Sequence, residues 1–295
     1  MTSLGNSRIA IVGLGLMGGS LAAALSESKT CSRVVGIARR QWSIDQASQR
    51  RWIDHGTLDL RRGVNGADIV VLATPVRTII QLIGRIGPWL NEECLLMDVG
   101  STKREIISAM EGLPPGVEPV GGHPMCGKEV SGLEAAEPDL YEGAPFILTP
   151  LERTSPAALV LAQELVRAVG AHPLILDAEL HDRLVGAVSH LPYLVAAALV
   201  QTAEGVGDER VWRLAASGFR DTSRLASSDV DMMRDILLTN RGVMVDLLRR
   251  YQDQLDRWLI ALEMEDEEEL ERMMRAARRG RALSSARKSE DGGER

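Results

Sequence analysis

The sequence predicts an α/β domain with a mostly parallel, doubly wound sheet, followed by an all-helical domain. Over the first part of the chain, short apolar runs rich in β-branched residues alternate with helical patterns. From residue 177 onward the strand-like runs disappear, and the segments 185–203 and 231–262 have helix-forming compositions. These two observations divide the chain at about residue 176.

The α/β domain is expected over residues 1–176 and the helical domain over 177–283. Acidic residues at 263–271 are expected to begin a last helix, whose basic end at 275–281 suits the helix dipole. Residues 284–295 are polar, and we expect a disordered tail there. Apolar runs bounded by glycine, proline or charged residues predict strands at 8–12, 33–37, 68–72, 94–99, 117–121, 145–148 and 172–176.

Composition limits the classes of function. The chain has 295 residues, 45% of them hydrophobic, and a net charge of -7, so it offers no general basic surface for nucleic acid. Its three cysteines are far apart and have no histidine at metal-ligand spacing, so we expect no metal site. No export signal and no uninterrupted apolar run of about 18 residues is visible. We therefore expect a cytoplasmic, non-membrane protein that acts on a small molecule.

A glycine motif follows the first expected strand. Gly13, Gly15 and Gly18 form G-x-G-x-x-G, with Leu16 and Met17 between the second and third glycine and an alanine-rich helical pattern after them. Gly13 permits a tight turn, Gly15 lets backbone approach a pyrophosphate, and Gly18 allows close packing of helix on strand. The order of strand, turn and helix predicts a Rossmann-type dinucleotide site, with the phosphates at the helix N-terminus.

The second expected strand ends in Ala38, Arg39 and Arg40. NAD-preferring sites usually place a carboxylate here to bind the ribose 2'-hydroxyl. Two guanidinium groups are instead suited to a 2'-phosphate, which predicts NADP as the preferred cofactor and leaves NAD as the alternative. Solvated surface arginines remain the other interpretation.

Further polar residues follow the later strands, at the edge of the sheet where ligands of such folds bind. Thr74 and Pro75 resemble a loop on the nicotinamide side of the cofactor. Ser101 and His123 follow the next two strands, and an imidazole is suited to take a hydroxyl proton as hydride leaves. His123 is the candidate base, and Ser101 is the hydroxyl expected to orient it or the substrate.

An ordered set of motifs over roughly residues 8–260 resembles the prephenate and arogenate dehydrogenases. The motifs are G-L-G-L-M-G-G-S, D-V-G-S-T-K, G-G-H-P-M, L-Y-E-G, I-L-T-P, H-D, S-H-L-P and G-F-R-D-T-S-R. The resemblance implies a nucleotide-binding domain joined to a helical domain that forms a homodimer, with the active site between them. It also implies oxidative decarboxylation of prephenate or arogenate, with hydride transfer to NADP or NAD, giving 4-hydroxyphenylpyruvate or tyrosine.

The resemblance implies further site residues. His123 matches the family's catalytic histidine and Ser101 its partner, while His190 matches a histidine on the substrate side. Arg224 matches the arginine that pairs with a substrate carboxylate, and Arg220, four residues earlier, is a second candidate on the same face if the segment is helical. Tyr193 stands where some members carry another substrate-facing histidine, which leaves the choice of substrate open.

Two local expectations concern the start of the helical domain. Pro192 removes the hydrogen bond to the carbonyl of Val188 and predicts a kink. His181 lies nine residues before His190 and would fall about half a turn away on a regular helix, so it is expected to be a capping or interdomain residue rather than part of the site.

Two other functions are compatible with the nucleotide motif. A β-hydroxyacid dehydrogenase shares the glycine-rich opening but uses a lysine on a helix after the nucleotide-binding domain, and this chain has no lysine between 177 and 283. A non-catalytic NADP-binding sensor would not need Ser101, His123, His190 and Arg224 together.

Overall fold

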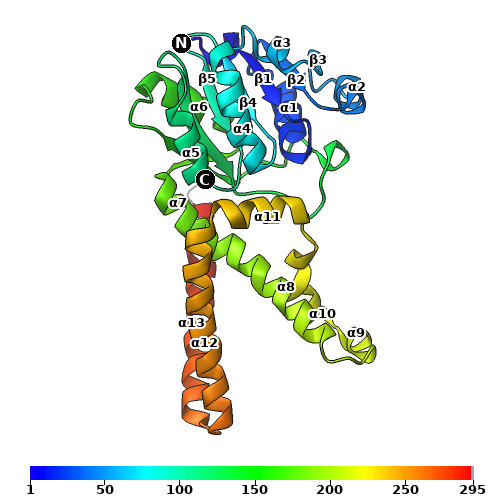
Figure 1. The fold of residues 1–295 in the computed structure, drawn as a ribbon, viewed down its shortest axis with the longest axis vertical. Coiled ribbons are helices and arrows are strands. Elements are labelled where there is room, and N and C mark those ends of the chain that lie inside the picture. The colour runs from blue at the N-terminus through cyan, green and yellow to red at the C-terminus, as the bar shows by residue number, and fades with distance from the viewer. Residues whose placement is uncertain (294–295) are drawn as a thin grey trace. The chain divides into compact units, whose positions relative to one another are not determined.

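The computed structural model describes residues 1–293, with side chains through residue 282. It divides into two compact units, Met1–Met244 and Val245–Arg295. The first unit holds one eight-stranded sheet and its helices (Figure 1). The sheet order is β3-β2-β1-β4-β5-β6-β7-β8, and all neighbouring strands are parallel except β6 and β7. The doubly wound, mostly parallel sheet is therefore confirmed.

The seven predicted strands are confirmed to within a few residues. They are β1 (Arg8–Val12), β2 (Arg33–Ile37), β4 (Ile69–Leu72), β5 (Leu95–Asp98), β6 (Glu118–Pro124), β7 (Pro145–Pro150) and β8 (His172–Ile175). The sequence missed β3 (His55–Thr57), which has no apolar run and pairs only with one edge of β2. Such a short edge strand depends on its partner rather than on its own composition.

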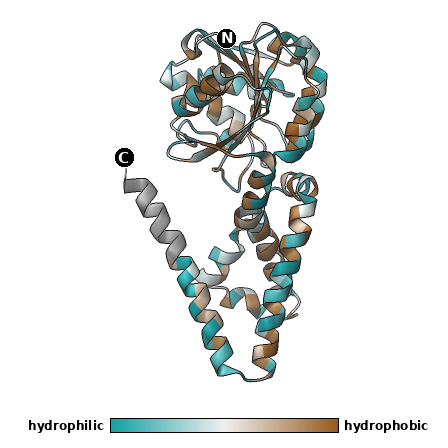
Figure 2. Ribbon diagram, turned by 90° about the vertical axis from the view of Figure 1, so that its left-hand side faces the viewer, coloured by the Kyte–Doolittle hydropathy of each residue, from teal (hydrophilic) through white to brown (hydrophobic). Residues whose placement is uncertain are grey.

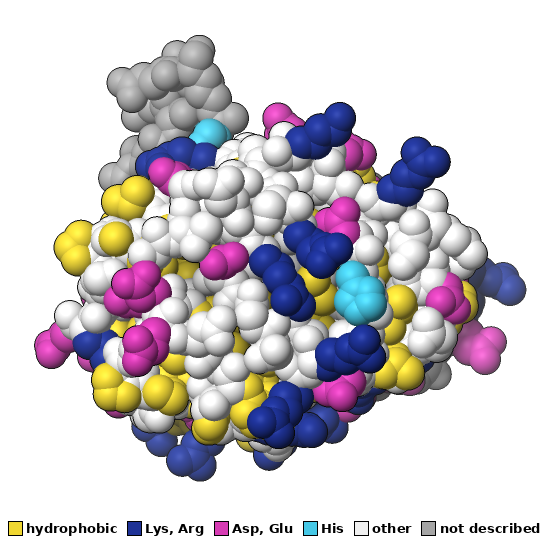
Figure 3. All heavy atoms as spheres, turned by 90° about the horizontal axis from the view of Figure 1, so that it is seen from above, with side chains coloured by type: hydrophobic (Ala, Val, Ile, Leu, Met, Phe, Trp, Pro, Cys, Tyr) yellow, Lys and Arg dark blue, Asp and Glu magenta, His cyan; other side chains and the backbone are white. Residues whose placement is uncertain are grey.

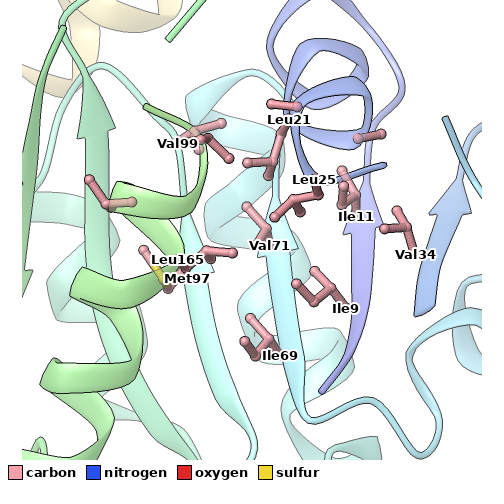
Figure 4. Packing of buried hydrophobic residues seen from close by; sticks show 14 of the residues in the cluster. Ile9, Ile11, Leu21, Leu25, Val34, Ile69, Val71, Met97, Val99 and Leu165 are labelled. Carbon is pink, nitrogen blue, oxygen red and sulfur yellow. The ribbon is translucent and has the colours of Figure 1, made fainter. Parts of the chain in front are cut away.

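Two layers of helices cover the sheet. α1 (Leu16–Ser28) and α6 (Pro156–Ala168) contribute to one hydrophobic cluster, in which Leu21 and Leu25 point toward Ile11 and Val71 (Figure 4). α4 (Val76–Ile86) and α5 (Arg104–Glu111) contribute to a second cluster. Figure 2 shows hydrophobic residues gathered on the strands of this domain, with mixed colours on the helices around them. The other α-helices of the domain are α2 (Gln41–Gln49) and α3 (Leu60–Val64).

Charged side chains on one end of the molecule are mixed in sign. Seen from above, several Lys and Arg side chains lie around a His side chain on the right of the view, with Asp and Glu side chains among them and toward the left (Figure 3).

The helical part begins with α7 (Ala178–Val185) and continues through a π turn, Gly186–His190, into α8 (Leu191–Glu204). Leu191 N–H donates to the carbonyl of Gly186, five residues earlier. Pro192, in the first turn of α8, has no N–H to donate. The irregularity predicted at the proline is thus a π turn directly before it.

The remaining helices of the first unit are α9 (Arg210–Leu214), α10 (Ser217–Ser223), the 3-10 turn Arg224–Ser227 and α11 (Val230–Thr239). α8 packs against α10 and this 3-10 turn. The stretch Ala178–Glu204 is long and apolar enough to span a membrane by length and composition alone. In its most apolar 18-residue segment, 22% is buried inside the protein. A helix that packs against protein passes the same test, so this is weak evidence for a membrane.

α12 (Arg241–Glu263) leads into the second unit, where α13 (Glu267–Gly293) follows a short turn. Arg257 of α12 pairs with Glu269 of α13 at 3.1 Å. The last helix begins near the predicted acidic run and continues to Gly293, through most of the segment 284–295 in which the sequence predicts a tail. Residues 294 and 295 of that tail lie outside the described residues.

Candidate active site

The glycine-rich loop joins β1 to α1 in a conformation that side chains would prevent. Gly13 has a φ of 105°, and a Cβ there would lie 2.5 Å from the carbonyl oxygen of Ala73. A Cβ on Gly18 would collide with the carbonyl oxygen of Gly13. Gly15 precedes α1 without a side-chain cap, and Leu16 and Met17 form the first turn, so the first N–H groups of the helix are left for a ligand. This cradle fits a pyrophosphate.

Residues beside this loop also leave polar groups free. Thr74 Oγ1 is buried without a hydrogen-bond partner, and Pro75, the next residue, caps the N-terminus of α4. Arg39 and Arg40 are exposed after β2, next to the half-buried Ala38, and within the described part of the chain neither forms an ion pair. The loop, the unpaired hydroxyl and these guanidinium groups are compatible with a bound dinucleotide.

His123 lies in β6, opposite Ile147 of β7, and its side chain is 8% exposed. Its Nδ1 lies 2.8 Å from Nε2 of His181, which α7 supplies. The Nδ1 of His181 lies 2.7 Å from the carboxylate Oδ1 of Asp182, and both His181 and Asp182 are fully buried. Two histidines and one carboxylate thus form a continuous chain of hydrogen bonds.

Asp182 connects this chain to the start of α5. Its Oδ1 accepts from the backbone N–H of Lys103 at 2.7 Å, and its Oδ2 accepts from that of Arg104 at 3.0 Å. Both N–H groups are at the helix N-terminus, where they have no partner within the helix and favour a negative charge. The two backbone donors therefore fix the carboxylate at the start of α5.

A buried ion pair connects the end of β5 to the residue before α5. Lys103 Nζ is 2.5 Å from Asp98 Oδ2, and both side chains are inaccessible to solvent. Asp98 also accepts from the backbone N–H groups of Gly100 at 2.7 Å and Gly122 at 3.0 Å. Because Gly122 precedes His123, the carboxylate ties the end of β5 to the strand that carries the imidazole.

His190 ends the π turn and is 1% exposed. Its Nδ1 lies 3.3 Å from Nδ2 of Asn240, which also donates to the backbone carbonyl of Asp182 at 2.8 Å. Since the amide donates, Nδ1 of His190 accepts and Nε2 carries the proton. That Nε2 is buried without a partner, as is Oδ1 of Asn240, so both atoms are free to bind a ligand.

Burial governs the protonation of these groups. Burial lowers the pKa of His123 well below its usual 6.5, and interactions with His181, Lys103 and His190 lower it further. Burial lowers the pKa of His190 to about 4, with Asp182 opposing this shift and His181 adding to it. Burial also lowers the pKa of Lys103, against the attraction of Asp98. Both histidines are consequently neutral near pH 7.

The other site residues named from the sequence are not joined to His123 in the part of the chain that the structure describes. Ser101 is half-buried after β5 and has no hydrogen bond to the imidazole. Tyr193 is half-buried in α8. Arg220 in α10 is exposed, and the exposed Arg224, at the start of the 3-10 turn, pairs with Glu129.

The sequence predicts His181 as a capping or interdomain residue rather than part of the site, whereas the structure joins it by a hydrogen bond to the candidate base His123. The π turn accommodates one extra residue, so the nine residues from His181 to His190 turn about as far as eight in a regular helix, which leaves the two side chains about 80° apart instead of opposite. Asp182 and Asn240 were also missed. The adjacent His181 and Asp182 form one of the motifs that carry the family resemblance, and this motif was the one signal in the sequence that pointed to Asp182.

A nucleotide-binding α/β domain with a buried neutral histidine beside its ligand edge defines the class of this protein: a pyridine-nucleotide-dependent dehydrogenase. The chain belongs to the prephenate dehydrogenase family. A protein-family model described as prephenate dehydrogenase, nucleotide-binding domain, matches residues 21–175. The model described as prephenate dehydrogenase, dimerization domain, matches residues 177–276.

Individual relatives agree with this assignment. The chain is 36% identical to a prephenate dehydrogenase from Bacillus subtilis over 92% of this chain and 74% of the relative. It resembles the structure of prephenate dehydrogenase from Aquifex aeolicus in complex with hydroxyphenyl propionate and NAD+ with a TM-score of 0.88 and 33% identity, covering 96% of this chain and 99% of the other. Arogenate dehydrogenase from Synechocystis matches with a TM-score of 0.78 and 29% identity, covering 94% and 99%.

Proposed function

We propose that the protein oxidises and decarboxylates prephenate or arogenate and transfers the hydride to NADP in preference to NAD. The observation that carries the proposal is His123: a buried, neutral imidazole next to the end of β5 and held by one hydrogen bond through its Nδ1. A neutral imidazole accepts a proton, and oxidation of an alcohol requires a base at the hydroxyl.

The cofactor would be held by the glycine loop and the N-terminus of α1. When bound, the nicotinamide accepts the hydride. The chain's own groups would orient it: the amides around Gly15, the first turn with Leu16 and Met17, and the unpaired hydroxyl of Thr74 next to Pro75.

The choice of NADP rests on the segment after β2. Ala38 offers no carboxylate for a ribose 2'-hydroxyl, while Arg39 and Arg40 are exposed and suited to a 2'-phosphate. Replacing both arginines with alanine should raise the KM for NADP by about tenfold or more and change that for NAD by less than about threefold. An equal change for both cofactors would contradict the assignment.

His123 would take the proton of the ring hydroxyl as hydride leaves the same carbon. Loss of the ring carboxylate as carbon dioxide then makes the ring aromatic, so the step is effectively irreversible. Ser101 would orient the imidazole or the substrate once the site is filled. Positioning of the base accounts for a factor on the order of 100 to 10,000 in rate.

Carboxylates of the substrate would bind cationic and neutral donors. Arg224 would exchange its pairing with Glu129 for a substrate carboxylate, and Arg220 on the preceding helix is the second candidate. His190 presents a protonated Nε2 that has no partner, and Tyr193 follows it by three residues. These two are candidates to contact the ring.

Two properties of the whole protein complete the proposal. The match to a dimerization domain over residues 177–276 supports a homodimer. Exposed apolar side chains such as Leu184 and Val188 would be covered in it. Contacts between two subunits would bury the exposed apolar side chains of the stretch Ala178–Glu204. The enzyme is then a cytoplasmic one with no nucleic-acid partner.

The test is steady-state reduction of NADP and of NAD with prephenate and, separately, with arogenate. Turnover with one pair identifies the substrate and the cofactor. His123→Asn should remove turnover and leave the Kd for the cofactor within about twofold, because the imidazole is not part of the nucleotide cradle. Cofactor binding without turnover on either substrate would overturn the proposal and favour a sensor.

A further inference from the structure

The hydrogen bonds between α7 and β6 determine which nitrogen of His123 carries a proton. Asp182 is an acceptor on both oxygens, because it receives the backbone N–H groups of Lys103 and Arg104. The Nδ1 of His181, 2.7 Å from the same carboxylate, must therefore be the donor. In a neutral ring its Nε2 is then an acceptor, so Nδ1 of His123 donates across the 2.8 Å contact.

We propose that His181 and Asp182 are positioning residues that hold His123 with its proton on Nδ1 and its lone pair on Nε2. The catalytic significance of this arrangement rests on the proposed function of His123 as the base. The order of the protons itself follows from the hydrogen-bond partners and is a property of the protein without substrate.

The reverse order of protons is unfavourable at two points. It would place the unprotonated Nδ1 of His181 against the Asp182 carboxylate, so that two acceptors would face each other in a fully buried place. It would also leave Nε2–H of His123 toward the ligand, where a base is needed. The other charged or titratable groups around the imidazole are Lys103, which pairs with Asp98, and His190.

The chain of hydrogen bonds also acts after proton transfer. When Nε2 of His123 accepts the proton of the substrate hydroxyl, the ring becomes an imidazolium whose Nδ1–H points at the lone pair of His181. The negative charge of Asp182 lies at the far end, two hydrogen bonds away. It stabilises the imidazolium without itself becoming protonated, in the manner of the carboxylate in a serine hydrolase triad.

The proton positions can be measured directly in the intact protein. The chain has five histidines, so ¹⁵N-labelled imidazole signals can be assigned with one variant for each residue. We expect His123 near neutral pH to show a protonated Nδ1 and an unprotonated Nε2. A proton on Nε2 of His123 would overturn the proposal, whatever happens to the variants.

Two substitutions separate positioning from packing. In His181→Gln the side-chain amide oxygen can accept a hydrogen bond from His123, and the amide N–H can donate one to Asp182. The kcat should therefore fall by less than about tenfold. In His181→Phe the ring volume is kept and the acceptor is lost, so kcat should fall by about 100-fold or more with the cofactor Kd within about twofold. His172→Gln, on the exposed surface of β8, is the matched control.

The outcomes distinguish the two hypotheses. If His181→Phe keeps kcat within about threefold of the active wild type, the positioning role fails and the proposed function stands. If the wild type has no turnover with prephenate or arogenate, the proposed function fails. The catalytic role of the His123–His181–Asp182 hydrogen-bond chain, the relay, then fails with it. Rescue of kcat by glutamine but not by phenylalanine supports the relay, because a purely structural role would not need an acceptor at this position.

Discussion

Acid should destabilise this protein through a histidine of its site, and His190→Gln should remove part of the effect. His190 has a pKa of about 4 in the folded chain, compared with 6.5 for an unperturbed histidine, because it is buried. Between these two pH values the unfolded chain binds a proton that the folded chain does not. Stability contributed by the neutral, buried imidazole is therefore lost as pH falls from about 6.5 toward about 4.

The size of the effect follows from the two pKa values. Their difference, 6.5 minus about 4, is about 2.5 and corresponds to about 3 kcal/mol when complete. At about pH 5 roughly 2 kcal/mol of this has been lost. The free energy of unfolding of the wild type should thus decrease by about 2 kcal/mol more than that of His190→Gln between about pH 7.5 and about pH 5.

The assay is urea unfolding at both pH values, monitored by the fluorescence of the five tryptophans. The protein concentration is kept constant, because dimerisation would make the measured stability depend on it. Burial, the largest cause of the lowered pKa of His123, is the same in both proteins, whereas the smaller contribution from His190 is lost with the substitution. His172→Gln should behave like the wild type, since this side chain is exposed. Equal losses of stability in His190→Gln and the wild type would refute the reasoning.

Three further predictions follow from the buried contacts. Lys103→Met should cost about 3–5 kcal/mol because Asp98 stays buried without its cation, and a decrease in Tm of less than about 5 °C in a thermal scan would contradict this. Gly18→Ala should weaken cofactor binding by about tenfold or more, because its Cβ would collide with the carbonyl of Gly13; an unchanged Kd in a fluorescence titration would disprove it. Asn240→Ala should cost about 1–3 kcal/mol by removing the donor to the buried Nδ1 of His190 and a hydrogen bond to the Asp182 carbonyl, and urea unfolding within about 0.5 kcal/mol of the wild type would count against it.

Local patterns accounted for most of the α/β domain. The buried strands β1, β4 and β5 are short apolar runs, and the run at 8–12 followed by Gly13 and Gly18 predicts both a strand and the turn after it. The missed strand β3 shows the limit of this approach. Its three residues have no apolar pattern of their own and are ordered by hydrogen bonds to β2.

Part of the buried histidine cluster was named from the sequence. His123 and His190 were named from their motifs, and the structure places both in one buried cluster. His181 was placed outside it because a regular helix was assumed, and the π turn before Pro192 changes the direction of the side chain. Asn240, near the end of the first unit, carried no motif at all.

The order of apolar runs, glycines and motif residues along the chain was enough to establish the family, the nucleotide cradle and the histidine that we propose as the base, because these depend on neighbours close in sequence. The partners of that histidine depend on the tertiary structure. The hydrogen bonds between His123 and His181, and from the Lys103 backbone N–H to Asp182, join segments 58 and 79 residues apart. Proton positions and pKa values in the site follow from burial and from these distant contacts, and both exist only when the chain is folded.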